Sequence, residues 1–168
     1  MNNFGTIVAI DSQTLIWAIR GEGSEDQKNS ANWLFQELQE WKAQVIIPSI
    51  CLAEYLVPIP VDHHRDVIAS LSRFIIAPFD VRCASTAAKL FMEEKPKREM
   101  SAHSSRKVLK ADCMIVATAS THGAQKFYSN DTRCRKIATR ANLLAEDLPK
   151  GPKTLFDMQS DDFEQQID

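Results

Sequence analysis

Short apolar runs alternate along the chain with longer segments in which apolar residues recur every three or four positions. The runs predict buried strands at residues 6–10, 45–48, 75–79, 125–129 and 143–144. The periodic segments predict helices at residues 14–19, 31–42, 50–57, 63–74, 81–94, 108–121 and 132–141. Repeated strand–helix–strand units imply an α/β fold in which helices cover both faces of one parallel sheet.

Capping and breaking residues set the helix boundaries. Ser30 and Ser49 stand where side chains cap the second and third helices. Pro58 stops the third helix, because proline lacks a backbone donor. Residues 95–105 are polar and basic and predict a loop.

Length and composition favour one soluble domain. The 168 residues contain no internal repeat, and we expect a domain over residues 1–148 and an acidic tail over residues 149–168. No apolar stretch approaches the ~18 residues that span a bilayer, and the N-terminus does not resemble a signal peptide. A cytoplasmic location is therefore expected.

The cysteines and histidines predict no reactive centre. No CxxC pair occurs, which favours reduced thiols packed in the core for Cys51, Cys83, Cys113 and Cys134. No histidine is placed to activate Cys113 as a nucleophile. The histidines lack the spacing of metal ligands and are expected at the surface: His63, His64, His103 and His122.

Charge is distributed unevenly although the net charge is only -2. Residues 95–140 hold eleven Lys or Arg and three acids, and residues 146–168 hold seven acids and two lysines. A basic middle beside an acidic end favours an anionic partner, with nucleic acid as the leading candidate. A solvated surface of uneven charge is the alternative.

Four acids stand in apolar surroundings, where a carboxylate costs several kcal/mol unless it is paired or binds a cation. They are Asp11, Glu54, Asp112 and Asp131. Asp11 and Asp131 each follow a predicted strand, and parallel sheets gather their sites at such ends. Glu54 and Asp112 are expected on apolar helix faces. A shared divalent metal site explains all four, whereas helix capping or an arginine partner explains individual members.

The segments around these acids resemble, in order, the four motifs of the PIN-domain ribonucleases, and most of all VapC-like toxins of toxin–antitoxin pairs. The matching segments are Asp11-Ser12-Gln13-Thr14-Leu15, Pro48 to Glu54, Lys110 to Ala119 and Ser129-Asn130-Asp131. The resemblance covers roughly residues 6 to 145. Gln13 departs from it, because the family has a shorter Asn there to hold the first Asp, and the basic stretch 95–107 is longer than a minimal PIN domain needs.

The resemblance implies a PIN-like three-layer α/β/α fold with a central parallel sheet of four to five strands. It implies an endoribonuclease that depends on Mg²⁺ or Mn²⁺, with Asp11, Glu54, Asp112 and Asp131 as catalytic acids and metal ligands. It further implies an RNA substrate, a cognate antitoxin protein and a homodimer. Candidate substrate contacts at the same rim are Lys110, Ser129, Asn130, Arg133 and Arg135, with Ser49 as a further hydrogen-bond donor.

Two other classes compete with this interpretation. A non-catalytic PIN-like module that binds RNA or protein would keep the fold without a working metal site, and the presence of all four acids disfavours it. A phosphatase with an Asp nucleophile would want a second Asp two residues after Asp11, where the chain has Gln13.

Overall fold

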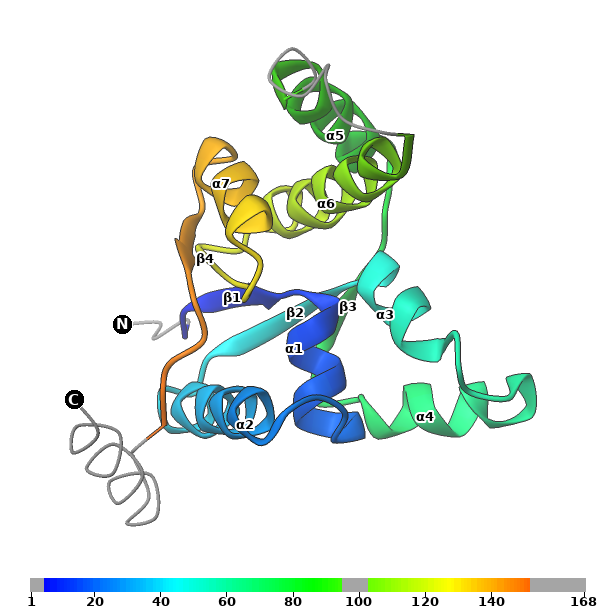
Figure 1. Ribbon diagram of the computed structural model, residues 1–168, viewed down its shortest axis with the longest axis vertical. Helices are drawn as coiled ribbons and strands as arrows, with labels where there is room; N and C mark the ends of the chain where they lie inside the picture. Colours follow the sequence, from blue (N-terminus) through cyan, green and yellow to red (C-terminus); the bar gives the residue numbers. More distant parts are fainter. Residues whose placement is uncertain (1–4, 95–102, 152–168) are drawn as a thin grey trace, which may run out of the picture.

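The computed structural model describes residues 5–94 and 103–151, with side chains from residue 107 in the second range. Its centre is one sheet of five parallel strands in the order β3-β2-β1-β4-β5 (Figure 1). The strands are β1 (Ile7–Ile10), β2 (Gln44–Pro48), β3 (Ile75–Ala77), β4 (Lys126–Tyr128) and β5 (Leu144–Glu146). The predicted parallel sheet is confirmed, including its number of strands.

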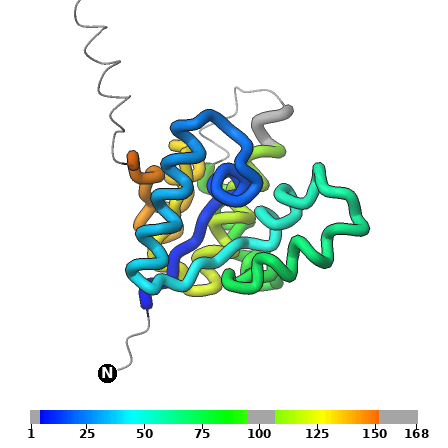
Figure 2. The backbone as a smooth tube through the Cα atoms, turned by 90° about the horizontal axis from the view of Figure 1, so that it is seen from below, coloured from blue at the N-terminus to red at the C-terminus, as the bar shows by residue number. Residues whose placement is uncertain are grey.

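Two groups of helices enclose this sheet (Figure 1). The first covers one face and comprises α1 (Ser12–Leu15), the π-helical turn η1 (Ile16–Arg20), α2 (Glu25–Glu40), α3 (Ser49–Leu56), the 3₁₀ turn η2 (Val61–His63) and α4 (His64–Ser70). The second covers the other face and comprises α5 (Val81–Glu94), α6 (His103–Thr121) and α7 (Thr132–Arg140). Figure 2, seen from below, shows α1 and α2 in front of the strands, which agrees with this three-layer α/β/α arrangement.

The strand order places a topological switch point between β1 and β4. From β1 the chain moves to β2 and β3 on one side, and β4 and β5 then extend the sheet on the other side of β1. Connections therefore leave β1 and β4 in opposite directions, and open α/β sheets bind their ligands beyond the carboxyl ends of the strands at such a point. Asp11 and Ser129 are the first residues beyond these two ends.

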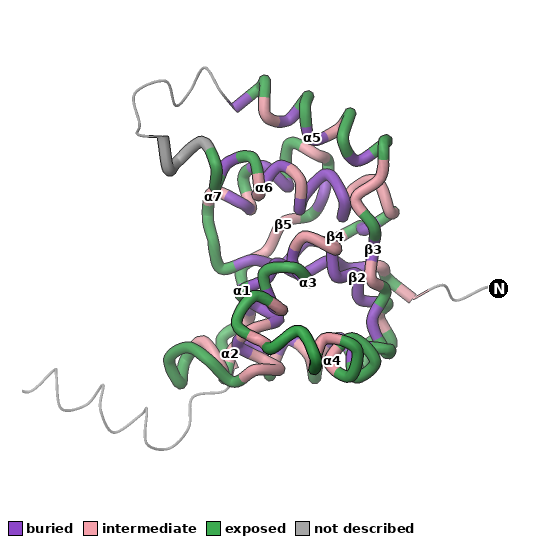
Figure 3. The backbone as a smooth tube through the Cα atoms, turned by 90° about the vertical axis from the view of Figure 1, so that its right-hand side faces the viewer, coloured by how far each residue is buried: buried purple, intermediate pink, exposed green. Residues whose placement is uncertain are grey.

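The core lies on both faces of the sheet (Figure 3). Ile10, Ile46 and Phe127 are fully buried in the strands, Leu34 of α2 covers one face and Val116 of α6 is fully buried within the group that covers the other. Strands covered on both faces are apolar throughout, which explains why continuous apolar runs identified them. No helix in the described part of the chain is both long and apolar enough to cross a membrane.

Two predicted helix caps are wrong. Helix α2 begins at Glu25, because the Ser24 side chain accepts a hydrogen bond from Gln27 N while the Gln27 side chain accepts one from Ser24 N. Ser30 therefore lies inside the helix. Ser49 does not cap α3 either, since its hydroxyl accepts a hydrogen bond from Phe79 N at 3.1 Å and ties the start of α3 to the end of β3.

Other boundaries differ at the helix ends. Helix α6 begins at His103, so the end of the predicted loop 95–105 is helical. Helix α4 ends at Ser70 in place of residue 74, because Leu71 and Phe74 continue in turns. Residues 95–102 of that loop, and residues 152–168 of the predicted tail, lie outside the described residues.

Candidate active site

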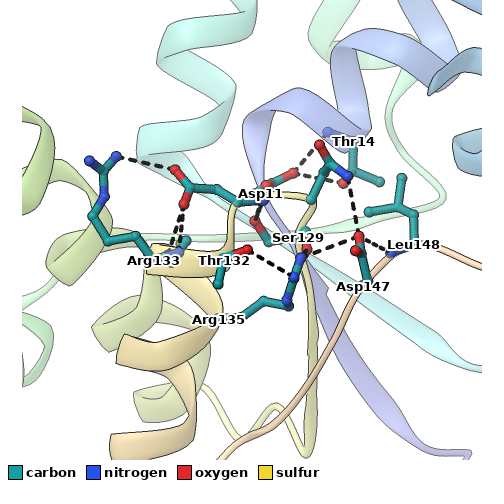
Figure 4. A network of polar contacts seen from close by, with 11 residues as sticks. Asp11, Thr14, Ser129, Thr132, Arg133, Arg135, Asp147 and Leu148 are labelled. Atoms are coloured by element: carbon teal, nitrogen blue, oxygen red, sulfur yellow. Dashed lines mark hydrogen bonds and ion pairs between the residues drawn. The ribbon is translucent and has the colours of Figure 1, made fainter.

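Asp11 is held at the carboxyl end of β1, where it caps α1. Its backbone N donates to Tyr128 O at 3.2 Å, which ties it to the end of β4. One carboxylate oxygen, Oδ1, accepts from Thr14 N at 2.8 Å and Thr14 Oγ1 at 2.7 Å. The other, Oδ2, accepts from Ser129 Oγ at 2.5 Å. Three donors from two segments therefore fix the orientation of a buried carboxylate (Figure 4).

The electrostatic state of Asp11 reflects its burial. Loss of water raises the pKa of this carboxyl above its ordinary value, and the charge of Asp131 raises it further. The hydrogen bonds from Ser129 and Thr14 act in the opposite direction, because they stabilise the ionised form. A nearby cation would therefore stabilise the ionised form of Asp11.

Asp131 follows β4 and caps α7. Its Oδ1 accepts from Arg133 N at 2.7 Å and Cys134 N at 3.3 Å, while its own backbone N donates to Ser129 Oγ at 3.0 Å. The Ser129 hydroxyl therefore bridges Asp131 and Asp11, donating to one and accepting from the other. This bridge couples the ends of β1 and β4.

Arg133 places a cation between two of the predicted acids. Its Nε donates to Asp112 Oδ2 at 2.8 Å and its Nη2 to Asp131 Oδ2 at 3.1 Å. Asp112 is buried in α6, with only 9% of the residue exposed, and Asp131 is exposed in the α7 turn. One guanidinium thus joins α6 to α7 and offsets the repulsion between their carboxylates.

Two buried thiols lie within electrostatic reach of the predicted acids. Burial raises the pKa of Cys134 well above its ordinary value, and the charges of Asp112, Asp11 and Asp131 raise it further. Burial likewise raises the pKa of Cys51, followed by the charges of Asp11 and Glu54.

The expected burial of Glu54 is wrong. Glu54 is exposed, and Val57 on the same face of α3 is 82% exposed. Ile50 on the same face is half-buried against the core, so the packed part of this face does not extend to Glu54 and Val57, which periodicity alone did not reveal. Glu54 nevertheless lies close enough to act on the Cys51 thiol.

The donor set suits a hard divalent cation. Carboxylate and hydroxyl oxygens are the ligands that Mg²⁺ and Mn²⁺ prefer. The guanidinium between Asp112 and Asp131 shows that positive charge is stabilised there. In the described residues, however, the ligand atoms that approach within 4.8 Å of one another are those of Asp80, Cys83 and His122, and the four acids stand farther apart.

Comparison with protein families identifies the family of this chain. The model of the PIN domain matches residues 8–140, most of the chain and all four acids. The chain belongs to the PIN domain family. PIN domains are in general nucleases, and they generally use divalent metals. No curated protein sequence matches the chain.

Solved structures share this PIN fold at low sequence identity. DNA-bound VapBC2 of Rickettsia felis has 21% identity and a TM-score of 0.60, covering 86% of this chain and 100% of its own. DNA-bound VapBC of Salmonella typhimurium has 18% identity and a TM-score of 0.58, covering 86% and 99%. A toxin–antitoxin complex of Klebsiella pneumoniae has 21% identity and a TM-score of 0.50, covering 75% and 88%. These likenesses support the fold.

The predicted rim residues of the PIN domain have different surroundings. Ser129 and Arg133 join the acids, as described above. Arg135 donates from Nη1 to Ser129 O at 2.6 Å and pairs with Asp147 at 3.2 Å. The exposed Asn130 also donates to Asp147, at 3.3 Å. Lys110 is exposed on α6, and its ammonium lies 5.5 Å from the Phe91 ring centroid.

Two supporting residues were missed from the sequence. Thr14 gives Asp11 two hydrogen bonds, and its position three residues after an N-cap Asp is a recognisable capping signal. Gln13, which was expected to hold Asp11, is exposed. Asp147 follows β5 and binds both Arg135 and Asn130, and no local pattern in the sequence links it to the site.

Proposed function

We propose that this PIN domain is a divalent-metal-dependent endoribonuclease and the toxin component of a toxin–antitoxin pair. One observation carries the proposal: Asp11, Asp112 and Asp131 gather around Ser129 and Arg133 at the switch point of the sheet. Carboxylates in such proximity repel one another unless cations compensate. The crevice at a switch point is also where open α/β sheets bind ligands.

Asp11 and Asp112 are the residues we expect to hold Mg²⁺ or Mn²⁺ directly, with Glu54 and Asp131 as further ligands or as partners of metal-bound water. When bound, such an ion polarises the scissile phosphate and lowers the pKa of an attacking water. The exposed positions of Glu54 and Asp131 leave this side of the site open to a polynucleotide.

The residues around the acids prepare them for this task. The hydrogen bonds from Ser129 and Thr14 favour the ionised form of Asp11 and orient its carboxylate, which reduces the reorganisation needed when the cation arrives. Arg133 pairs with both Asp112 and Asp131 and offsets part of their negative charge. Once a metal replaces it, its guanidinium is free to bind an RNA phosphate, for which its planar donors are suited.

Other rim groups serve substrate binding in this proposal. The exposed Lys110 and Asn130 are available to phosphate or base groups, and Arg135 supports the turn at Ser129 through its backbone carbonyl. The cation on Lys110 is held near Phe91, so its contribution is charge more than a specific contact.

Partners follow from the kind of complex that related folds form. The structural neighbours include VapBC and toxin–antitoxin complexes, and we propose that this chain likewise has a cognate antitoxin. We further propose that it forms a homodimer in the cytoplasm. An antitoxin would inhibit by placing basic and apolar side chains near the acids.

The test is cleavage of end-labelled total RNA by purified protein that is folded and free of bound inhibitor. Wild type with Mn²⁺ should give discrete fragments, which should vanish with EDTA and with Asp11→Asn. Asp66→Asn, an exposed acid in α4, is the matched control and should cleave like wild type. Absence of cleavage with every metal tested would favour a non-catalytic PIN-like module that binds RNA or protein.

A further inference from the structure

A second group of potential metal ligands lies at the junction of β3, α5 and α6. One ligand atom each from Asp80, Cys83 and His122 lies within 4.8 Å of the others. Asp80 directly precedes α5, Cys83 lies in the first turn of α5, and His122 directly follows α6. Figure 1 shows that β3 leads into α5 and that α5 and α6 run beside each other, which brings the start of one helix to the end of the other.

Hydrogen bonds already orient all three side chains. Asp80 Oδ1 accepts from Cys83 N at 3.0 Å, which fixes the carboxylate over the first turn of α5. The Cys83 thiol donates to Pro78 O at 3.7 Å, and His122 Nε2 bonds to the same carbonyl at 2.9 Å. The thiol and the imidazole therefore converge on one point although 39 residues separate them in the sequence.

We propose that Asp80, Cys83 and His122 form a site for Zn²⁺ that is separate from the acid cluster. A thiolate, an imidazole and a carboxylate are the donor types that zinc takes, whereas Mg²⁺ and Mn²⁺ avoid sulfur. Donation from His122 Nε2 to the Pro78 carbonyl leaves the lone pair on Nδ1. A ring nitrogen that binds metal while the other donates to a carbonyl is the usual arrangement of metal-bound histidine.

The geometry requires only a small closure. Tetrahedral zinc sites hold their ligand atoms about 3.3–3.7 Å apart, so the three ligand atoms, which now lie within 4.8 Å of one another, have to move closer by about 1 Å and the His122 ring has to present Nδ1 to the ion. Cys83 is buried, while Asp80 and His122 are partly exposed, which leaves a side on which water can complete the coordination. The ion would fasten the β3–α5 turn to the end of α6.

Arg82 is the competing partner. Its Nη2 and Nε lie 2.8 and 3.1 Å from Asp80 Oδ2. The Arg82 side chain is 70% exposed, so water screens its attraction to Asp80 and the ion pair is weak. The other oxygen of Asp80 accepts from the backbone N of Cys83, and a cation bound there would have to displace Arg82 from the carboxylate.

The proposal is tested by titration of the reduced full-length protein with Co²⁺, which substitutes for zinc. A thiolate-to-cobalt charge-transfer absorption band then reports ligation by sulfur. We expect one equivalent to produce this band and Zn²⁺ to abolish it. Cys83→Ser and His122→Gln should lose the band or weaken Co²⁺ binding at least tenfold. Zn²⁺ should raise the thermal midpoint of wild type but not of these variants.

Matched controls separate the two sites. Cys51→Ser removes another buried thiol that donates to a backbone carbonyl, and His64→Gln removes another imidazole that bonds to one, at 2.9 Å. Both controls, and Asp112→Asn in the acid cluster, should keep the band. If Cys83→Ser fails to fold by circular dichroism, the partly exposed His122 decides the question. Absence of the band in wild type, or its survival in His122→Gln and Cys83→Ser, would overturn the proposal.

Discussion

Replacement of Arg133 by alanine tests whether this guanidinium and a metal compete for the same acids. Arg133 bonds to Asp112 and Asp131, with 30% of its side chain exposed, against 12% for Asp112 and 45% for Asp131. Arg133→Ala leaves both carboxylates without this cation. We therefore expect lower stability without metal and tighter binding of Mn²⁺.

The expected magnitude lies between two limits. Fully exposed ion pairs contribute about 0–1 kcal/mol, and removal of one partner of a buried pair costs about 3–5 kcal/mol. The partial burial of Arg133 and Asp112 places the loss at about 1–3 kcal/mol. Because a metal has to displace Arg133, the variant recovers this amount on binding, which makes Mn²⁺ bind about 5- to 150-fold more tightly.

The assay is urea unfolding in EDTA together with calorimetric titration of Mn²⁺. Arg135→Ala is the control, because Arg135 is similarly buried at 20% side-chain exposure but bonds to Ser129 O and Asp147. It should lose stability without a gain in affinity. Unchanged or weaker Mn²⁺ affinity in Arg133→Ala, with the stability loss present, would refute the competition.

Three further substitutions probe the acids and their supports. Asp11→Asn should reduce cleavage at least about a hundredfold and raise the free energy of unfolding in EDTA at pH 7. Because burial raises the pKa of Asp11, this gain over wild type should shrink as pH falls through the folded pKa towards the ordinary value, which urea titrations at several pH values would reveal. Ser129→Ala removes a hydrogen bond that lowers the pKa of Asp11, so the acidic limb of the pH–cleavage profile should move to higher pH. The free energy of unfolding should fall by about 1–3 kcal/mol. An unmoved acidic limb would show that Ser129 does not tune the pKa of Asp11. Asp112→Asn should abolish cleavage. Because it removes a contact of Arg133, it should also lower the free energy of unfolding in EDTA by about 1–3 kcal/mol. Greater stability than wild type would argue that repulsion between the carboxylates outweighs the ion pair with Arg133.

Much of the fold follows from the sequence because the strands are covered on both faces. Residues such as Ile46 and Phe127 belong to short continuous apolar runs, which is the pattern of a parallel sheet. Helix α5 was predicted with its observed ends, Val81 and Glu94. The start of α2 was missed since Ser24 lies six residues before Ser30 and acts through a reciprocal bond with Gln27.

The site was predictable to the extent that local rules place it. Asp11 and Asp131 follow strands, and the strand-end rule brings them together correctly. Glu54 was expected to be buried because it shares a face with Ile50 and Val57, but only Ile50 packs against the core, while Glu54 and Val57 are exposed. The contact of Arg133 with Asp112 joins residues 21 positions apart on different helices, and only the packed fold reveals it.

The same limit applies to the zinc-type ligands. Cys83 and His122 were assigned to core and surface because no local spacing links them. Their convergence on the Pro78 carbonyl depends on the antiparallel packing of α5 and α6.

The most direct test of the central claim is the binding of Mn²⁺ to the acid cluster, measured by electron paramagnetic resonance on inhibitor-free wild type and on Asp112→Asn. The account predicts one or two bound ions in wild type, loss of binding in Asp112→Asn, and unchanged binding in the Cys83→Ser control. Equal Mn²⁺ binding by wild type and Asp112→Asn would contradict it, because the metal would then lie away from the acids that we assign to catalysis.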